Sequence, residues 1–170
     1  FYERLEIKNA LSYLRLLVNR NDDTAMERVI NVPTRGIGGR TIDLIRDLAR
    51  RESISLWQAC IDSVNNKLLT ARAANSVLAF LELIDCMAAE CETLPLHEKA
   101  EHIVKYSGLI HHHDKEGDEK ARGRLENLEE LINAASNFDG ISSEEAVDVT
   151  SNAMLAAFLD KASLDAGDTQ

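Results

Sequence analysis

Apolar residues recur every three or four positions along most of the chain, which is the spacing of one buried helix face. Ile7, Leu11, Leu14 and Val18 form the first such series. No stretch alternates apolar and polar residues as a strand does, and no segment repeats at a fixed period. The pattern therefore predicts an all-α fold of about seven to eight helices. Because 170 residues is an ordinary domain length, we expect residues 1–170 to form one helical domain.

Polar and glycine-containing breaks set the limits of the expected helices. Residues 111–124 are polar and lack apolar periodicity, so they are predicted to form a flexible loop. The dipeptide Asp139-Gly140 is predicted to end the helix that follows this loop. In chain order the expected helices cover residues 3–19, a short segment at 26–30, a segment at 42–49, one opened by Ser55, 68–92, one from Pro95 to Ser107, 125–138 and a last segment at 155–162.

The most informative break lies between two of these helices, from Pro33 to Thr41. Pro33 ends the short helix, a Gly-Ile-Gly turn follows, and the next helix starts at once. Ile37 can anchor this turn in the core, while the glycines let the backbone approach a ligand closely. Free N–H groups at a helix start attract phosphate. The arrangement is helix-hairpin-helix-like and predicts contact with a nucleic-acid backbone, although an ordinary helix–helix turn stays an alternative.

The candidate DNA-binding residues belong to two segments. The turn and the start of the next helix supply backbone amides and side-chain donors. The polar face of the first helix adds two cations, although these could simply belong to a solvated helix face. These candidates are Thr34, Arg35, Gly36, Ile37, Gly38, Gly39, Arg40, Thr41, Lys8 and Arg15.

The charge distribution supports a local site rather than a basic surface. The chain carries a net charge of −10, which argues against a non-specific nucleic-acid coat because phosphates are repelled by such an average surface. Between Pro33 and Arg51, however, five arginines face two aspartates, a local excess of three positive charges.

The residues give no indication of an enzyme active site. Gly39-Arg40-Thr41 resembles the end of a phosphate-binding P-loop, but Thr34 stands where a glycine is required and Arg40 where a lysine is required. We therefore predict no ATP site and no catalytic residue. The run His111–His113 lacks further ligands at suitable spacing, so no metal or other cofactor is predicted. The three cysteines show no zinc spacing and are expected to be buried, reduced thiols.

Three stretches together resemble one family, the UvrD/Rep/PcrA-type superfamily 1 DNA helicases. They are FYERLEIKNALSYLR at 1–15, PTRGIG at 33–38 and GRLENLEEL at 123–131. These are similar to the family segments F-x-E-R-x-E-I-K-D-A-L-x-Y-L-R, P-x-R-G-I-G and R-x-E-N-L-E-E-L, and the overlap is greatest with the UvrD branch. Asn9 replaces the usual acidic residue, and residues 111–117 have no counterpart in the pattern.

The resemblance implies that this chain corresponds to the 2B subdomain, an all-α insert in the second motor domain of such helicases. It implies that ATP and magnesium bind elsewhere in the parent protein, a 3′-to-5′ ATP-dependent helicase. The implied partners are double-stranded DNA at a fork or junction, the motor domains and repair proteins, with no membrane. The implied setting is the bacterial cytoplasm and nucleoid, in DNA replication and in nucleotide excision and mismatch repair.

Two other functions stay open at this point. The acidic surface and the polar segment 111–124 would also suit an autoinhibitory or protein-docking helical module with little DNA affinity. A metal-dependent enzyme centred on the histidines would require a bound ion.

Overall fold

The computed structural model describes residues 1–145 and 151–167, and within these ranges it contains helices and no strand. The prediction of an all-α fold is confirmed, and the described residues form more helices than the seven to eight that were expected. The helices are α1 (Leu5–Val18), α2 (Asp23–Val29), α3 (Gly39–Glu52), α4 (Leu56–Asn65), α5 (Ala71–Cys91), α6 (Leu96–Tyr106), α7 (Leu109–Asp114), α8 (Glu119–Glu145) and α9 (Ser151–Asp165).

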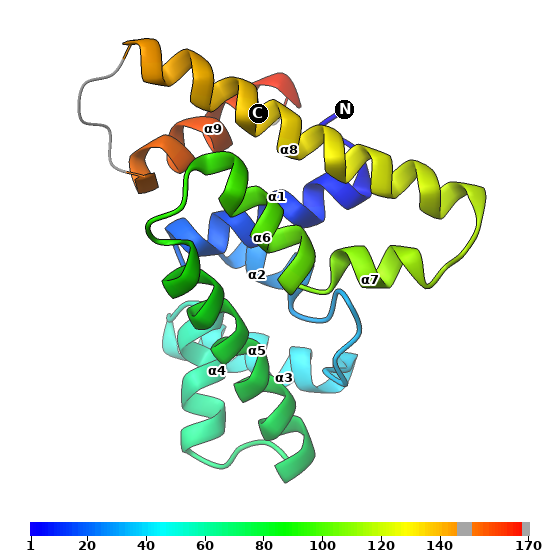
Figure 1. Ribbon diagram of the computed structural model, residues 1–170. Helices are drawn as coiled ribbons and strands as arrows, with labels where there is room; N and C mark the ends of the chain where they lie inside the picture. The colour runs from blue at the N-terminus through cyan, green and yellow to red at the C-terminus, as the bar shows by residue number, and fades with distance from the viewer. Residues whose placement is uncertain (146–150, 168–170) are drawn as a thin grey trace.

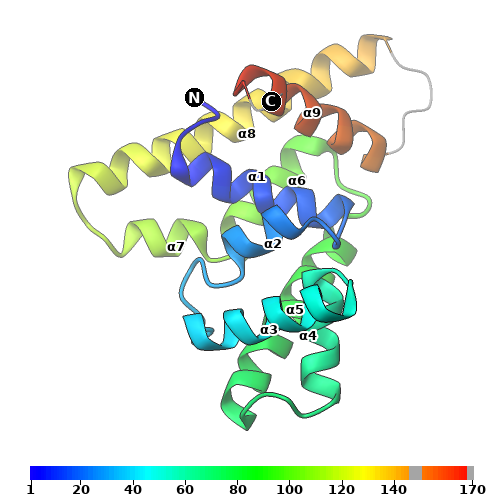
Figure 2. The ribbon, with the colours of Figure 1, turned by 180° about the vertical axis from the view of Figure 1, so that it is seen from behind.

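Helix α1 lies at the centre of the arrangement, with α8 and α9 toward one end of the molecule and α3 to α5 toward the other (Figures 1 and 2). It packs against α2, α5, α6, α8 and α9. Ile7, Leu11 and Leu14 are buried as predicted. Val18, the last residue of α1, was also predicted to be buried, but it is 43% exposed at the end of the helix.

Side-chain caps fix several of the helix starts. The carboxylate of Asp22 accepts a hydrogen bond from Ala25 N at the start of α2, and Thr70 Oγ1 accepts one from Ala73 N at the start of α5. Ser55 Oγ accepts from Gln58 N at 3.1 Å, so the predicted start of α4 is confirmed. The Gln58 side chain donates to Asp62 instead of reaching back, so only half of a capping box forms.

The predicted loop at 111–124 is wrong. Helix α7 occupies its first part and α8 begins at Glu119, which leaves only residues 115–118 between them. The helical order comes from tertiary packing, because α7 contacts α6 and α8 and buries Leu109 and His113. A helix of six residues with two buried positions is too short to show an apolar periodicity in the sequence.

The predicted end of α8 at Asp139-Gly140 is also wrong, since the helix continues to Glu145. Asp139 acts on another helix: its Oδ2 accepts a hydrogen bond of 2.9 Å from His97 N and thereby caps the start of α6. A glycine inside a helix costs about 1 kcal/mol, which the packing of α8 against α6 offsets.

Two of the three cysteines are buried as expected. Burial raises the pKa of Cys60 to about 12 and that of Cys91 to about 11, so both stay protonated. Cys86 departs from the expectation because it lies on the exposed face of α5. None of the described helices is both long and apolar enough to cross a membrane.

Candidate nucleic-acid interface

The Gly-Ile-Gly turn lies in the loop that joins α2 to α3 (Figure 1). Ile37 is fully buried, which confirms that it anchors the turn in the core, while Gly36 and Gly38 are exposed. Gly36 has φ of +79°, a conformation that glycine adopts readily and other residues rarely do. The Ile37 side chain thus anchors the turn, and the two glycines are presented to solvent.

Helix α3 begins without a side-chain cap. Gly38 occupies the N-cap position with extended φ and ψ, and no acidic residue lies in the first turn. The first intrahelical bond at this end joins Ile42 N to Gly38 O. Within the described residues, the amides of Gly39, Arg40 and Thr41 therefore make no hydrogen bond. Gly38, Gly39 and Arg40 are exposed, and a Cβ placed at either glycine would meet nothing within 4 Å, so an anion has room to approach this helix start.

Asn31 holds the turn in shape, a role that the sequence reasoning missed. Its Oδ1 accepts a hydrogen bond from Arg35 N at 2.7 Å and another from Ile37 N at 3.3 Å. The available signal was an asparagine just after a helix end, where such side chains often bond to the backbone that follows. The motif P-T-R-G-I-G therefore depends on a residue that precedes it.

The Arg35 side chain points into the protein rather than toward solvent. Its guanidinium donates to Val29 O at 2.7 Å, Ile30 O at 3.2 Å and Ser107 O at 3.3 Å. It also donates to the hydroxyl of Tyr13. The side chain that was expected to supply a phosphate contact thus joins the end of α2 to the end of α6.

Two aromatic rings flank the Arg35 guanidinium. Its central carbon lies 5.0 Å from the centre of the Phe80 ring and 5.7 Å from that of Tyr13. The Tyr13 hydroxyl donates in turn to Val32 O. Burial raises the pKa of Tyr13 even though the neighbouring Arg35 cation opposes this, so the phenol stays protonated as a donor. The turn therefore rests on a polar cluster of Asn31, Arg35 and Tyr13.

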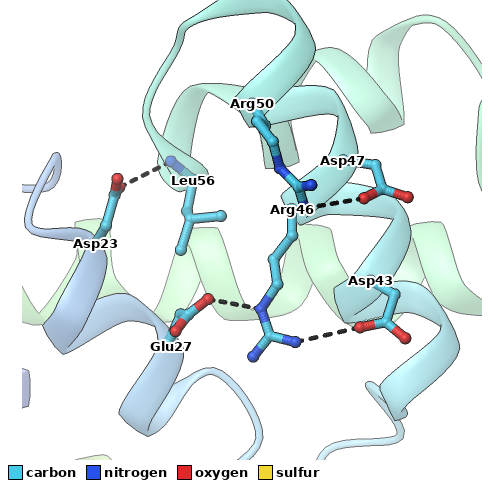
Figure 3. A network of polar contacts seen from close by, with 7 residues as sticks. All are labelled: Asp23, Glu27, Asp43, Arg46, Asp47, Arg50 and Leu56. Atoms are coloured by element: carbon cyan, nitrogen blue, oxygen red, sulfur yellow. Dashed lines mark hydrogen bonds and ion pairs between the residues drawn. The ribbon is translucent and has the colours of Figure 1, made fainter.

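Most of the local positive charge is neutralised by neighbours. Arg46 Nε lies 2.6 Å from Glu27 Oε1 on α2, and its Nη1 lies 3.1 Å from Asp43 Oδ1 (Figure 3). Arg50 pairs with Asp47, as the same figure shows, and Arg51 lies beside Glu52. Of the five arginines in this segment, Arg40 is the one for which the described residues provide neither an ion pair nor a side-chain hydrogen bond. It is exposed in the first turn of α3, beside the open amides.

A sequence profile of the UvrD-like helicase C-terminal domain matches residues 1–170. The chain belongs to this family. It is 48% identical over its whole length to DNA helicase II of Escherichia coli (strain K12), and 46% identical to that of Salmonella typhimurium. ATP-dependent DNA helicase PcrA of Staphylococcus aureus (strain Mu50) is 31% identical over 99% of the chain. The chain spans 23% of the length of each of these relatives.

In this UvrD-like chain, Lys8 and Arg15 lie apart from the turn. They line a groove of about 410 Å³ between α1, α2 and α9, and no residue of 34–41 contributes to its walls. Arg15 Nη2 donates to Ser163 Oγ of α9 at 2.9 Å, and Arg28 adds another cation. Their contribution to DNA binding stays a prediction, and it requires a second contact surface separate from the turn.

Asn31→Ala is expected to weaken both the fold and the turn. The substitution removes the acceptor of two backbone amides, which we expect to lower the free energy of unfolding by about 1–2 kcal/mol. Urea denaturation followed by circular dichroism measures this change. Asn31→Asp is the matched control, because it keeps the oxygen acceptor and is expected to retain most of the stability. An equal loss in both variants would contradict the proposed role of Oδ1.

Proposed function

We propose that this chain is the 2B subdomain of a UvrD-like, 3′-to-5′ ATP-dependent DNA helicase of DNA repair. Its own role would be to hold duplex DNA near a fork through the phosphate backbone, with no sequence preference. The observation that carries this proposal is the uncapped, exposed start of α3 at Gly38–Thr41. No residue within 1–145 or 151–167 bonds to the amides of Gly39–Thr41, and the first turn holds no acidic residue. Backbone amides bind phosphate oxygens and read no base edges.

The proposal gives the residues of 34–41, together with Asn31, three different roles. Gly38, Gly39, Arg40 and Thr41 would provide the amides and donors that touch phosphate. Ile37, Arg35 and Asn31 would hold those amides in place from behind. Thr34 and Gly36 are exposed on the loop beside them and complete the proposed surface.

The comparisons support a parent protein that is a helicase. The printed names of the relatives are DNA helicase II and ATP-dependent DNA helicase PcrA, and this chain matches about a quarter of each. We propose that ATP and magnesium bind in motor domains outside residues 1–170, that these motor domains are the main protein partners, and that the parent acts in the bacterial cytoplasm.

Gly38→Asp is the experiment that tests the DNA contact. An aspartate at the N-cap accepts hydrogen bonds from the open amides and adds a negative charge where phosphate would bind. We expect duplex affinity to fall at least tenfold, while the thermal midpoint stays constant or rises. Fluorescence anisotropy of a labelled duplex at low salt measures the affinity, and circular dichroism measures the midpoint.

Ser55→Asp is the matched charge control. It adds the same charge at the N-cap of α4, beyond the carboxyl end of the 14-residue helix α3 and therefore roughly 20 Å from Gly38. Affinity should be close to that of the unaltered protein. Equal weakening by both variants would mean that only net charge matters. Unchanged binding by Gly38→Asp would place the DNA contact elsewhere, and absence of binding by the unaltered chain would favour the protein-docking alternative.

A further inference from the structure

Helix α7 and the turn after it bring three potential metal ligands together. They are His112, His113 and Glu116, whose ligand atoms all lie within 4.8 Å of one another. Glu116 Oε1 lies 3.7 Å from His112 Nε2 and 3.5 Å from His113 Nδ1. The ligands of a tetrahedral zinc ion are separated by roughly 3.3 Å. Two of the three separations are thus close to those of a zinc site.

An independent observation comes from the burial of His113. Its side chain is 7% exposed, yet neither ring nitrogen makes a hydrogen bond within the described residues. Buried polar atoms almost always have a partner, and leaving one without costs free energy. A bound cation would supply a partner for one of these nitrogens.

The orientation of Glu116 suits such an ion. Arg124 Nη1 donates to Glu116 Oε2. This contact fixes the carboxylate and leaves Oε1 directed toward the two rings, which is how outer partners orient metal ligands.

We propose that His112, His113 and Glu116 bind one divalent transition-metal ion of the zinc class, with water completing the coordination. Imidazole nitrogens with one carboxylate are typical ligands for zinc, cobalt and nickel. The Arg124 cation opposes the charge of the ion, so the site binds more weakly than a cysteine-based structural site. The sequence predicted no metal because the adjacent histidines lacked further ligands at suitable spacing; the turn after α7 brings Glu116 close to both His112 and His113.

The proposed site lies next to the candidate DNA-binding loop. Pro33 and Thr34 of the loop and His112 and Glu116 of the proposed site line the same groove, which has a volume of about 570 Å³. Gly108, at the start of α7, contacts Pro33 so closely that a Cβ there would lie 3.3 Å from Pro33 Cγ. A bound ion would link His112 and His113 of α7 to Glu116 in the turn that follows the helix. This proposal does not depend on whether the loop binds DNA.

Isothermal titration of the chelator-treated chain with zinc chloride tests the proposal. We expect one ion per chain, and tetrahedral cobalt absorption when Co²⁺ replaces Zn²⁺. His112→Ala and Glu116→Gln should each lower the affinity at least tenfold, and His113→Ala should do the same if circular dichroism shows that it folds. His112 is 39% exposed and Glu116 is 30% exposed, so these two variants can be interpreted even if His113→Ala does not fold.

His111→Ala is the matched control on the same helix. This residue is exposed, lies next in sequence and is not part of the cluster. Its affinity should equal that of the unaltered chain. Absence of zinc binding by the unaltered chain, or equal weakening by His111→Ala and His112→Ala, would overturn the proposal.

Discussion

Replacing Arg35 by alanine is expected to lower the free energy of unfolding by about 3 kcal/mol. The guanidinium donates to the carbonyl oxygens of Val29, Ile30 and Ser107, and alanine leaves these acceptors without their donor. It also lies over the Phe80 ring, so its removal loses a cation–π contact. For a domain of this size the thermal midpoint should fall by roughly 6–12 °C. Urea denaturation and thermal melting followed by circular dichroism measure both changes.

Two further variants separate this structural role from phosphate binding. Arg35→Lys is expected to recover little stability, because a lysine ammonium lacks the planar fork that reaches several carbonyls at once. Arg40→Ala removes an exposed side chain and should leave stability unchanged while it weakens duplex binding. The opposite result would be an Arg35→Ala variant as stable as Arg40→Ala, in which the slope of log affinity against log salt concentration falls by the equivalent of one phosphate contact. In that case Arg35 contacts DNA directly.

The contrast between Arg35 and Arg40 shows where sequence reasoning reached its limit. Both arginines flank the same turn, and counting charges treats them alike. The inward orientation of Arg35 depends on Tyr13 and Ser107, which lie 22 and 72 positions away in the chain. Such contacts leave no local pattern. The buried anchor Ile37 was predictable, because a single large apolar side chain between two glycines is stabilised by burial in the core.

The fold class was predictable for a related reason. Apolar periodicity reports which face of each helix is buried, and long helices such as α1 and α5 repeat that signal several times. Helix α7 has only six residues, and three of them are the polar run His111–His113, so it shows no apolar periodicity. Asp139 was read as the end of α8, whereas its carboxylate caps α6, 42 residues earlier in the chain. Local signals identify a capping residue without telling which helix it caps.

Ile37→Ala is expected to lower the free energy of unfolding by about 3 kcal/mol, and Ile37→Val by about 1 kcal/mol. The side chain is fully buried, so alanine leaves a cavity, whereas valine removes a single methylene. Neither substitution alters a backbone amide or a charge at the start of α3. Any change in DNA affinity must therefore come from the position of the turn. Denaturation measures the first effect, and anisotropy under conditions where each variant is folded measures the second.

The valine variant should bind duplex DNA as the unaltered chain does, and the alanine variant several-fold more weakly. The reason is preorganisation: amides that are already fixed lose less freedom when a phosphate binds. If Ile37→Ala loses stability but keeps full affinity, then the hydrogen bonds from Arg35 N and Ile37 N to Asn31 are sufficient to hold the turn. In that case combining Ile37→Ala with Asn31→Ala should lower the affinity where Ile37→Ala alone does not. The pair of residues, rather than the buried anchor by itself, would then set the geometry of the phosphate contact.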